Sequence, residues 1–118
     1  MSIDEIHQRY LRAGAFGRDP DAVAALFTED GIYETPLVPD RLTGRDAIRA
    51  GIGVYQRDPG GTINIPQTRY QLHQSTDPEV FVAEMDVALD TPAGPRTMSL
   101  VQIFRLRDGL IAHLRDYF

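Results

Sequence analysis

The last ten residues of the chain, 109–118, alternate in the way that favours a β-strand. Read with a period of two, one face of that strand carries Leu110, Ala112, Leu114, Asp116 and Phe118. Four of these five residues are apolar, so the face is expected to pack on the core and to bring Asp116 with it. A bare carboxylate is costly in an apolar interior unless it is neutralised, hydrogen-bonded or used in chemistry. Asp116 is therefore the first candidate for a functional residue, and the alternative is a frayed strand end that leaves it in water.

Three earlier segments show the 3.6-residue period of amphipathic helices. The first is expected to end near Gly17 and the second at Asp30-Gly31, and the third buries Ile48, Ile52 and Tyr55. Their start signals are a Ser2–Glu5 capping box, Asp19 followed by Pro20, and Thr43 with Asp46. A short extended segment, residues 32–38, and a proline-containing loop separate the second helix from the third.

After Asp58-Pro-Gly-Gly61 the period changes from 3.6 to 2. Strands are predicted over residues 62–75, 79–91, 96–107 and 109–118, with turn signals at Asp77-Pro78, Pro92-Ala-Gly94 and Asp108-Gly109. Helices followed by an antiparallel meander indicate an α+β fold, with the helices against one face of a curved sheet.

The strand at 79–91 has two different faces. One is uninterruptedly apolar from Phe81 to Leu89, and the other includes Glu84, Asp86 and Asp90. Either the apolar face lies in the core and the acids in water, or the acids face a pocket and the apolar face meets another subunit. The strand at 96–107 also carries apolar groups on both faces, and such a sheet needs cover on both sides. This pattern favours a homodimer formed through the outer sheet face.

Composition excludes several classes of function. At 118 residues the chain is expected to be one domain, residues 1–118, and its formal charge of −5 argues against nucleic-acid and anionic-membrane partners. The absence of cysteine removes disulfides, thiol nucleophiles and cysteine metal sites. Neither a signal-peptide core nor a membrane-spanning run is present, so a soluble, cytoplasmic protein is expected. The three histidines lack ligand spacing; His7 is expected in solvent, and His73 and His113 at the surface or an interface.

Three short phrases then point to a family. Residues 24–31 (AALFTEDG), 44–48 (GRDAI) and 104–111 (FRLRDGLI) resemble, in order and spacing, the nuclear transport factor 2-like superfamily, also called the SnoaL-like fold. This resemblance implies a cone-shaped, curved antiparallel sheet wrapped around three N-terminal helices, a cystatin-like α+β barrel with a small-molecule pocket. The superfamily includes ketosteroid isomerases, polyketide cyclases, limonene-type epoxide hydrolases, dehydratases and members without catalysis, so the fold leaves the function open.

The ketosteroid isomerase resemblance is carried by the first helix. His7-Gln-Arg-Tyr10 resembles the segment with the oxyanion-hole tyrosine, which implies that Tyr10 donates a hydrogen bond to a developing oxyanion. The position of the base falls on Thr35, and that of the second oxyanion donor on Gln102. Threonine cannot remove an α-proton at pH 7, so an isomerase of this type would need the neighbouring Glu34 as its base.

The resemblance to limonene-type epoxide hydrolases is closer at the site. Residues 115–118 (RDYF) resemble the motif that holds one catalytic aspartate, placing it on Asp116, and residues 84–86 (EMD) occupy the segment of the other, placing it on Asp86. Tyr33 matches a tyrosine that positions the attacking water. Two residues depart from the family pattern: Thr35 replaces an asparagine, and Glu84 replaces the arginine between the two aspartates.

This resemblance places Asp86 on the pocket face and Met85 and Val87 toward the dimer side. A pocket lined by Tyr70, Leu72, Tyr55, Phe27 and Leu114 is expected around the acids. If Glu84, Asp86 and Asp116 converge there, at least one proton is shared, and a neutral acid beside a carboxylate can perform acid/base catalysis.

The leading hypothesis is a cofactor-independent acid/base enzyme, with neither metal nor organic cofactor, that opens an epoxide on a small hydrophobic substrate. The alternatives are a dimer that binds a small molecule without catalysis, and a divergent isomerase or polyketide cyclase-like enzyme.

Overall fold

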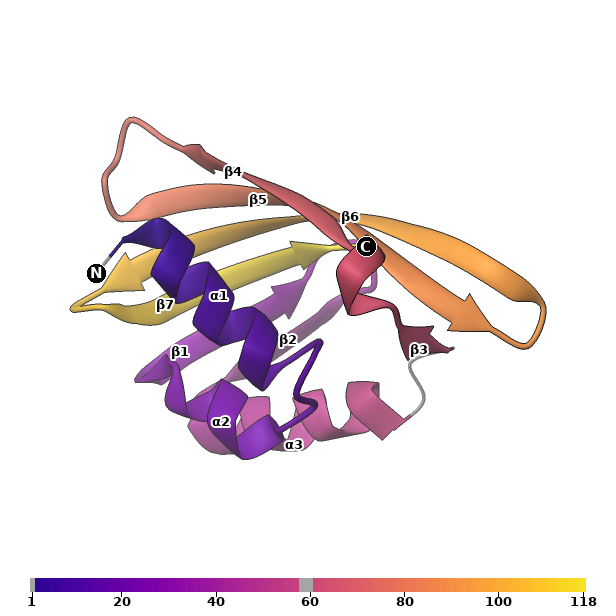
Figure 1. Cartoon of the computed structure of the whole chain (residues 1–118). Coiled ribbons are helices and arrows are strands. Elements are labelled where there is room, and N and C mark those ends of the chain that lie inside the picture. Colours follow the sequence, from indigo (N-terminus) through magenta and orange to yellow (C-terminus); the bar gives the residue numbers. More distant parts are fainter. Residues whose placement is uncertain (1, 58–60) are drawn as a thin grey trace.

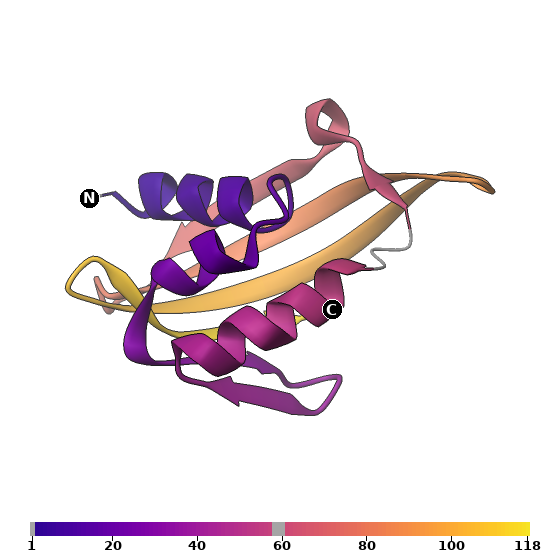
Figure 2. The ribbon, with the colours of Figure 1, turned by 90° about the horizontal axis from the view of Figure 1, so that it is seen from below.

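The computed structural model describes residues 2–57 and 61–118 and shows three helices against one face of a curved mixed sheet. The helices are α1 (Ile3–Ala13), α2 (Pro20–Ala25) and α3 (Arg45–Arg57), with a 3-10 turn η1 (Ile65–Gln67). The strands are β1 (Phe27–Thr35), β2 (Asp40–Thr43), β3 (Thr62–Ile63), β4 (Arg69–Gln74), β5 (Val80–Thr91), β6 (Gly94–Arg107) and β7 (Leu110–Tyr117). Figures 1 and 2 show all three helices on the same side of the sheet. The predicted α+β fold is confirmed.

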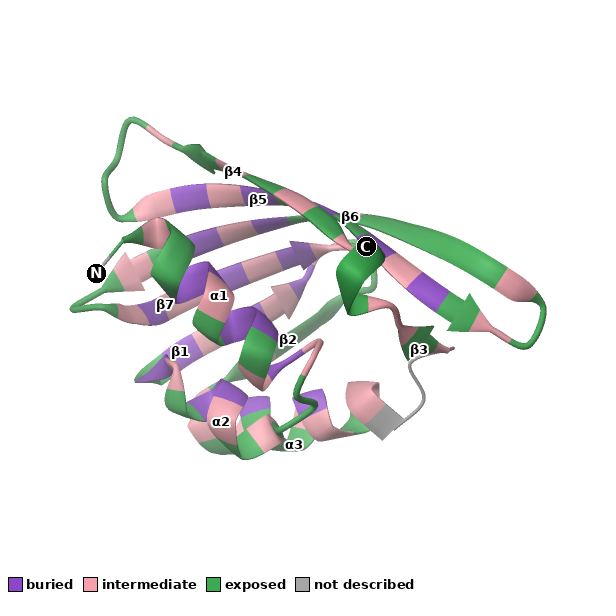
Figure 3. Ribbon diagram, viewed as in Figure 1, coloured by how far each residue is buried: buried purple, intermediate pink, exposed green. Residues whose placement is uncertain are grey.

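The sheet runs in the order β2-β1-β7-β6-β5-β3, and β4 also pairs with β5. All pairs are antiparallel except β1 with β7, which are parallel and bring the middle of the chain beside its C-terminal strand. In the described residues β5 and β6 are the two longest strands, and the far part of their hairpin extends past the helices (Figure 3). In that part β6 is mostly exposed, whereas β5 still alternates between buried and exposed residues.

Local chemistry explains the helix starts. The Ser2 side chain accepts a hydrogen bond from the Glu5 backbone N–H at 3.2 Å, and Asp19 accepts one from the Ala22 N–H at 3.1 Å. These two caps are the predicted ones, and each satisfies a backbone donor that a helix start leaves free. The turn before β7 also has the predicted chemistry, since Asp108 and Gly109 have φ values of 55° and 77°.

Several predicted boundaries are wrong. Helix α2 ends at Ala25, and β1 already begins at Phe27. The pairing of β1 with β7 is irregular between Phe27 and Ile32. Gly31 lies in this irregular part, where an added Cβ would be only 2.9 Å from the Phe27 Cβ. The predicted loop before α3 contains the short strand β2, which pairs with β1. The predicted strand 62–75 is divided into β3 and β4 by η1, which holds Pro66 and is capped by Asn64. The predicted change of period was placed at residues 58–61, of which 58–60 lie outside the described residues.

The core lies between the helices and the inner face of the sheet. Three of its largest side chains, Phe27, Phe81 and Phe104, are fully buried, and the Phe81 and Phe104 rings stack at 4.6 Å between centroids. Burying aromatic and aliphatic side chains in this way supplies most of the driving force for folding. The described helices are too short or too polar to cross a membrane.

Candidate active site

A cavity of about 500 Å³ lies between the helices and the inner face of the sheet. Its walls are mainly apolar, with side chains from α1, α3 and the strands β5 and β6, including Leu11, Ile52, Met85, Val87 and Leu100. Five of the predicted site residues line it together: Tyr10, Tyr33, Tyr55, Gln102 and Asp116. A largely apolar cavity with a few converging polar groups is the usual form of a small-molecule site.

Asp116 is the buried carboxyl group of this cavity. Its residue is 6% exposed, and the alternation of β7 carries it inward after Leu114, as the sequence predicted. The Tyr33 hydroxyl donates a hydrogen bond to Asp116 Oδ2 at 2.8 Å, whereas Oδ1 is buried and has no hydrogen-bond partner among residues 2–57 and 61–118. Burial raises the pKa of Asp116 to about 6, although Tyr33 and the Gln102 side chain stabilise the carboxylate and so oppose the rise.

Two tyrosines surround this carboxyl group. Burial, reinforced by the negative charge of Asp116, raises the pKa of Tyr10 well above its ordinary value. Burial likewise raises the pKa of Tyr33, with smaller effects from Tyr10 and Asp116. Both hydroxyls therefore keep their protons at neutral pH, and each can donate a hydrogen bond. The site thus combines one titratable carboxyl group with two neutral donors.

Glu84 and Asp86 do not join this site, and the prediction that they converge with Asp116 is wrong. Asp86 is exposed and accepts a hydrogen bond from the Ser99 hydroxyl at 2.7 Å, and exposed Glu84 pairs with His73 at 2.5 Å. Along β5 it is Met85 and Val87 that face the cavity. The uninterrupted apolar face of the strand decides its orientation, because turning that face outward would lose more burial than two carboxylates could offset.

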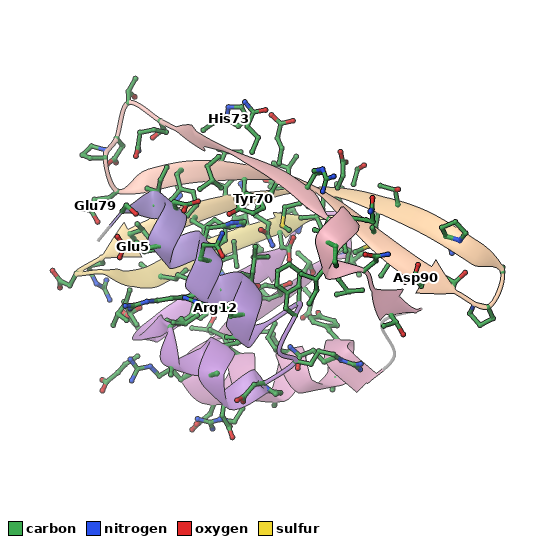
Figure 4. All side chains as sticks on the ribbon, viewed as in Figure 1. Glu5, Arg12, Tyr70, His73, Glu79 and Asp90 are labelled. Atoms are coloured by element: carbon green, nitrogen blue, oxygen red, sulfur yellow. The ribbon has the colours of Figure 1, made fainter. Side chains whose placement is uncertain are left out.

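The neighbouring strand β4 shows the same alternation. Figure 4 shows His73 projecting from the outer side of the sheet, whereas Tyr70 lies toward α1. The Tyr70 hydroxyl bonds with Gln8 and Asp4 of that helix, so Tyr70 joins β4 to α1 and does not line the cavity.

The remaining predicted site residues lie outside the cavity lining. Phe27, Leu72 and Leu114 pack in the core, and buried Thr35 donates to the Val38 carbonyl at 2.5 Å. Glu34 pairs with His113 at 2.9 Å and with Arg115 at 3.2 Å on β7. Glu34 is therefore engaged by two basic side chains and is not available as the base of an isomerase.

His7 also departs from its prediction. It was expected in solvent but is fully buried. Its spacing could have revealed this, because His7 lies one turn before Tyr10 and one turn after Ile3, on the helix face that packs against the sheet. The apolar cavity wall was missed for a different reason, since Met85 and Val87 belong to the strand whose face was assigned the wrong way round.

The described residues offer no cluster of three histidine, aspartate or glutamate side chains for a metal ion. The polar residues that line the cavity include Asp116, three tyrosines, two glutamines, Thr62 and Arg18. Such groups can bind an oxygen-bearing organic molecule and exchange a proton with it.

Comparisons with known structures agree with this architecture. A protein from Catenulispora acidiphila with a ketosteroid isomerase-like fold, solved in complex with trimethylamine, superposes with a TM-score of 0.77 at 19% identity over 100% of this chain and 87% of that one. An epoxide hydrolase/cyclase-like enzyme of pyran ring formation in salinomycin gives 0.72 at 21% identity, over 97% and 88%. A limonene epoxide hydrolase-like enzyme from Mycobacterium tuberculosis gives 0.65 at 23% identity, over 97% and 80%. At these identities the likeness concerns the fold.

The search of curated proteins found no match to this sequence. The sequence model of the SnoaL-like domain matches residues 7–114, which is most of the chain and ends two residues before Asp116. The chain therefore belongs to the SnoaL-like domain family.

Proposed function

We propose that this protein is an acid/base enzyme that moves a proton on the carbon next to a carbonyl group of a small, largely apolar substrate. The observation that carries the proposal is the buried Asp116 carboxyl group in a mainly apolar cavity, with one oxygen held by Tyr33 and the other unpaired among the described residues. A carboxyl group whose pKa is about 6 is mostly ionised at neutral pH and still basic enough to accept a proton.

The proposed mechanism uses two groups of the cavity. The Asp116 carboxylate removes a proton from the substrate carbon. The electron pair of the broken C–H bond delocalises onto the carbonyl oxygen, which gives an enolate. Tyr10 donates a hydrogen bond to the enolate oxygen, and its high pKa suits it to stabilise that charge without losing its own proton. Asp116 then returns the proton to another carbon, which isomerises the substrate, or to the alkoxide formed when the enolate attacks a second carbonyl group.

Epoxide opening is the second candidate, and the Tyr33–Asp116 hydrogen bond favours it. In that reaction the Asp116 carboxylate would take a proton from water while the water oxygen attacks an epoxide carbon. The epoxide C–O bond breaks, Tyr10 donates a hydrogen bond to the alkoxide that forms, and the alkoxide takes the proton back from Asp116. The two-carboxylate form of the mechanism loses its support, because Asp86 faces away from the cavity. Carbonyl chemistry ranks first because Asp116 and Tyr10 are sufficient for it, whereas epoxide hydrolysis also needs a water molecule held in position for attack.

The experiment is a proton-exchange assay with a matched control. Simple β,γ-unsaturated ketones, diketones and epoxides are incubated with the protein in D2O, and NMR follows exchange at carbon, isomerisation and ring opening. Asp116→Asn should lower the rate by about 10²-fold or more. Asp86→Asn removes the same charge from the outer face and should leave the rate unchanged.

Four outcomes separate the candidates. Exchange next to carbonyl groups that depends on Asp116 supports the first proposal, and turnover of epoxides alone supports the second. Full activity in Asp116→Asn would contradict both. Ligand binding that shifts the Asp116 signal without any turnover would mean a binding protein without catalysis.

We further propose that the protein works as a homodimer through the outer face of the sheet, where partly exposed apolar groups such as Val82, Val101 and Ile103 lie among polar ones. An apolar patch of this kind is favourable only when covered. Sedimentation velocity over a hundredfold range of concentration tests this proposal, and a monomer throughout would refute it.

A further inference from the structure

A row of three buried polar side chains crosses from α1 to the cavity. Gln102 on β6 stands directly opposite Asp116 on β7 in the strand register, and His7 of α1 packs over Phe104 two residues further along β6. The exposed fractions of His7, Gln102 and Asp116 are 0%, 4% and 6%. Three polar residues this deeply buried need partners, and their neighbours in the row are the nearest candidates.

The unpaired atoms of the described residues concentrate in this row. Among the described residues, six buried side-chain nitrogen and oxygen atoms make no hydrogen bond. Four of the six belong to this row: His7 Nδ1, His7 Nε2, Gln102 Oε1 and Asp116 Oδ1. Native proteins leave few buried polar atoms unpaired, and each exception calls for an explanation such as a catalytic role. Four such atoms in one row therefore point to a shared role.

The chemistry of the atoms is complementary. Burial lowers the pKa of His7, so its ring is neutral at pH 7 and carries a single N–H donor. The buried Oε1 atom of Gln102 can only accept a hydrogen bond, and the carboxylate of Asp116 can likewise only accept. A small side-chain rotation would thus let the His7 N–H donate to Gln102 Oε1 while the Gln102 amide N–H donates to Asp116.

We propose that His7 is a positioning residue, which holds the Gln102 amide in the orientation that presents its N–H group to the Asp116 carboxylate. Without a donor on its far side, the amide could rotate by half a turn and present its oxygen to the carboxylate, and two acceptors repel each other. His7 would act on the reaction only through Gln102. The effect on catalysis rests on the proposed function, whereas the arrangement of His7, Gln102 and Asp116 does not.

Other groups around the row do not supply this orientation. On the His7 side the ring faces Tyr70 of β4, whose hydroxyl is engaged with α1, and the nearest charge is Asp4 of the same helix. On the Asp116 side Tyr33 bonds to Oδ2, and Tyr10 lies close by as a neutral phenol. Among the described residues, Gln102 alone affects the pKa of both His7 and Asp116.

The test measures the titration of Asp116 by carboxyl-resolved NMR. Loss of one hydrogen bond to a carboxylate corresponds to about one pKa unit, so His7→Leu, which fills the aromatic pocket without an N–H, should raise the Asp116 midpoint by about that much. His7→Gln keeps an N–H donor and should restore most of the wild-type midpoint. In a Gln102→Leu background the His7→Leu substitution should produce no further shift.

An unchanged midpoint in folded His7→Leu would overturn the proposal, and so would a shift that persists in the Gln102→Leu background. If His7→Leu does not fold, the His7 ring N–H proton gives a second readout. Its resonance should move in Gln102→Leu, and a fixed resonance would overturn the proposal equally.

These results are separable from the proposed function. If the midpoint shifts as expected while Asp116→Asn keeps full activity, the proposed catalysis fails and the positioning role stands. If Asp116→Asn is inactive while folded His7→Leu leaves the Asp116 midpoint unchanged, only the positioning role fails.

Discussion

Tyr33 influences the protonation of Asp116, to which it is hydrogen-bonded. Its hydroxyl donates to Asp116 Oδ2 and so stabilises the charged form of the carboxyl group, which limits the rise in pKa caused by burial. Tyr33→Phe removes that donor, and we expect the Asp116 pKa to rise by about one unit above its wild-type value. If the reaction needs ionised Asp116, the acid limb of the pH profile of kcat/KM should then move to higher pH by about one unit.

The matched control for this substitution is Tyr55→Phe. Tyr55 also lines the cavity, but its hydroxyl bonds to Asp40 and not to Asp116. Removal of this second phenol hydroxyl should leave the acid limb where it is. An equal displacement in both variants would show that cavity polarity in general, and not the Tyr33 hydrogen bond, sets the protonation of Asp116.

At the residue scale, the sequence was informative where one periodicity dominated. Asp116 could be placed inside because four apolar residues share its face of the last strand. Asp86 was misplaced because resemblance to a two-aspartate site was given more weight than the apolar face from Phe81 to Leu89. His7 was misplaced because a titratable side chain was expected in water, although its helical spacing already aligned it with Ile3 and Tyr10.

The packing of α3 on β2 depends on a glycine. An alanine Cβ at Gly51 would lie 2.2 Å from Leu42 Cδ1, so the Leu42 side chain must move, whereas at Gly53 the nearest atom, Pro20 Cγ, is at an ordinary 3.7 Å. Replacing a helical glycine by alanine contributes about 0.5–1 kcal/mol by itself. Gly53→Ala should therefore raise the free energy of unfolding by about that amount, and displacement of Leu42 should cancel the gain in Gly51→Ala.

Urea unfolding of the two variants measures this difference. In a Leu42→Ala background the obstacle is gone, so the two alanine substitutions should then stabilise the protein equally. Equal gains with Leu42 still present would mean that β2 yields at no cost, and that its contact with α3 does not hold the two elements in place.

At the element scale, patterns predicted which segments are helices and strands better than where they pair. Caps and turns are local, so the start of α1 and the turn before β7 could be predicted from a few neighbouring residues. The parallel pairing of β1 with β7 joins residues about eighty positions apart, and no local signal encodes it. Strand β2 was missed because only its pairing with β1, and no apolar alternation of its own, makes it a strand.

At the scale of the whole molecule, the order of helices and strands and the family phrases were sufficient to predict the fold. They could not predict which acids share the cavity, because that depends on which face of each strand turns inward. The same chain can therefore be assigned to the right architecture and to a site with the wrong number of carboxylates. Among the described residues one acid, Asp116, lies buried in the interior, and it must affect the stability of the protein.

Asp116 should make the whole protein less stable as the pH rises. Its pKa is about 6 in the folded state and takes the ordinary value of 3.8 in the unfolded chain, so between these values the folded state binds more protons and stability falls with increasing pH. The difference corresponds to about 3 kcal/mol. Asp116→Asn lacks this titration, so its stability relative to wild type should be greater at pH 8 than at pH 4 by about that amount.

Urea unfolding at the two pH values measures this change, and the outer-face variant Asp86→Asn is again the control. Asp86 is exposed on the outer face, so its substitution controls for the loss of one carboxylate from the chain. A pH-independent difference for Asp116→Asn would mean that the carboxyl group is well solvated in the folded protein. The cavity would then lack the low polarity on which the proposed proton transfer depends, because a solvated carboxylate is a weaker base than a buried one.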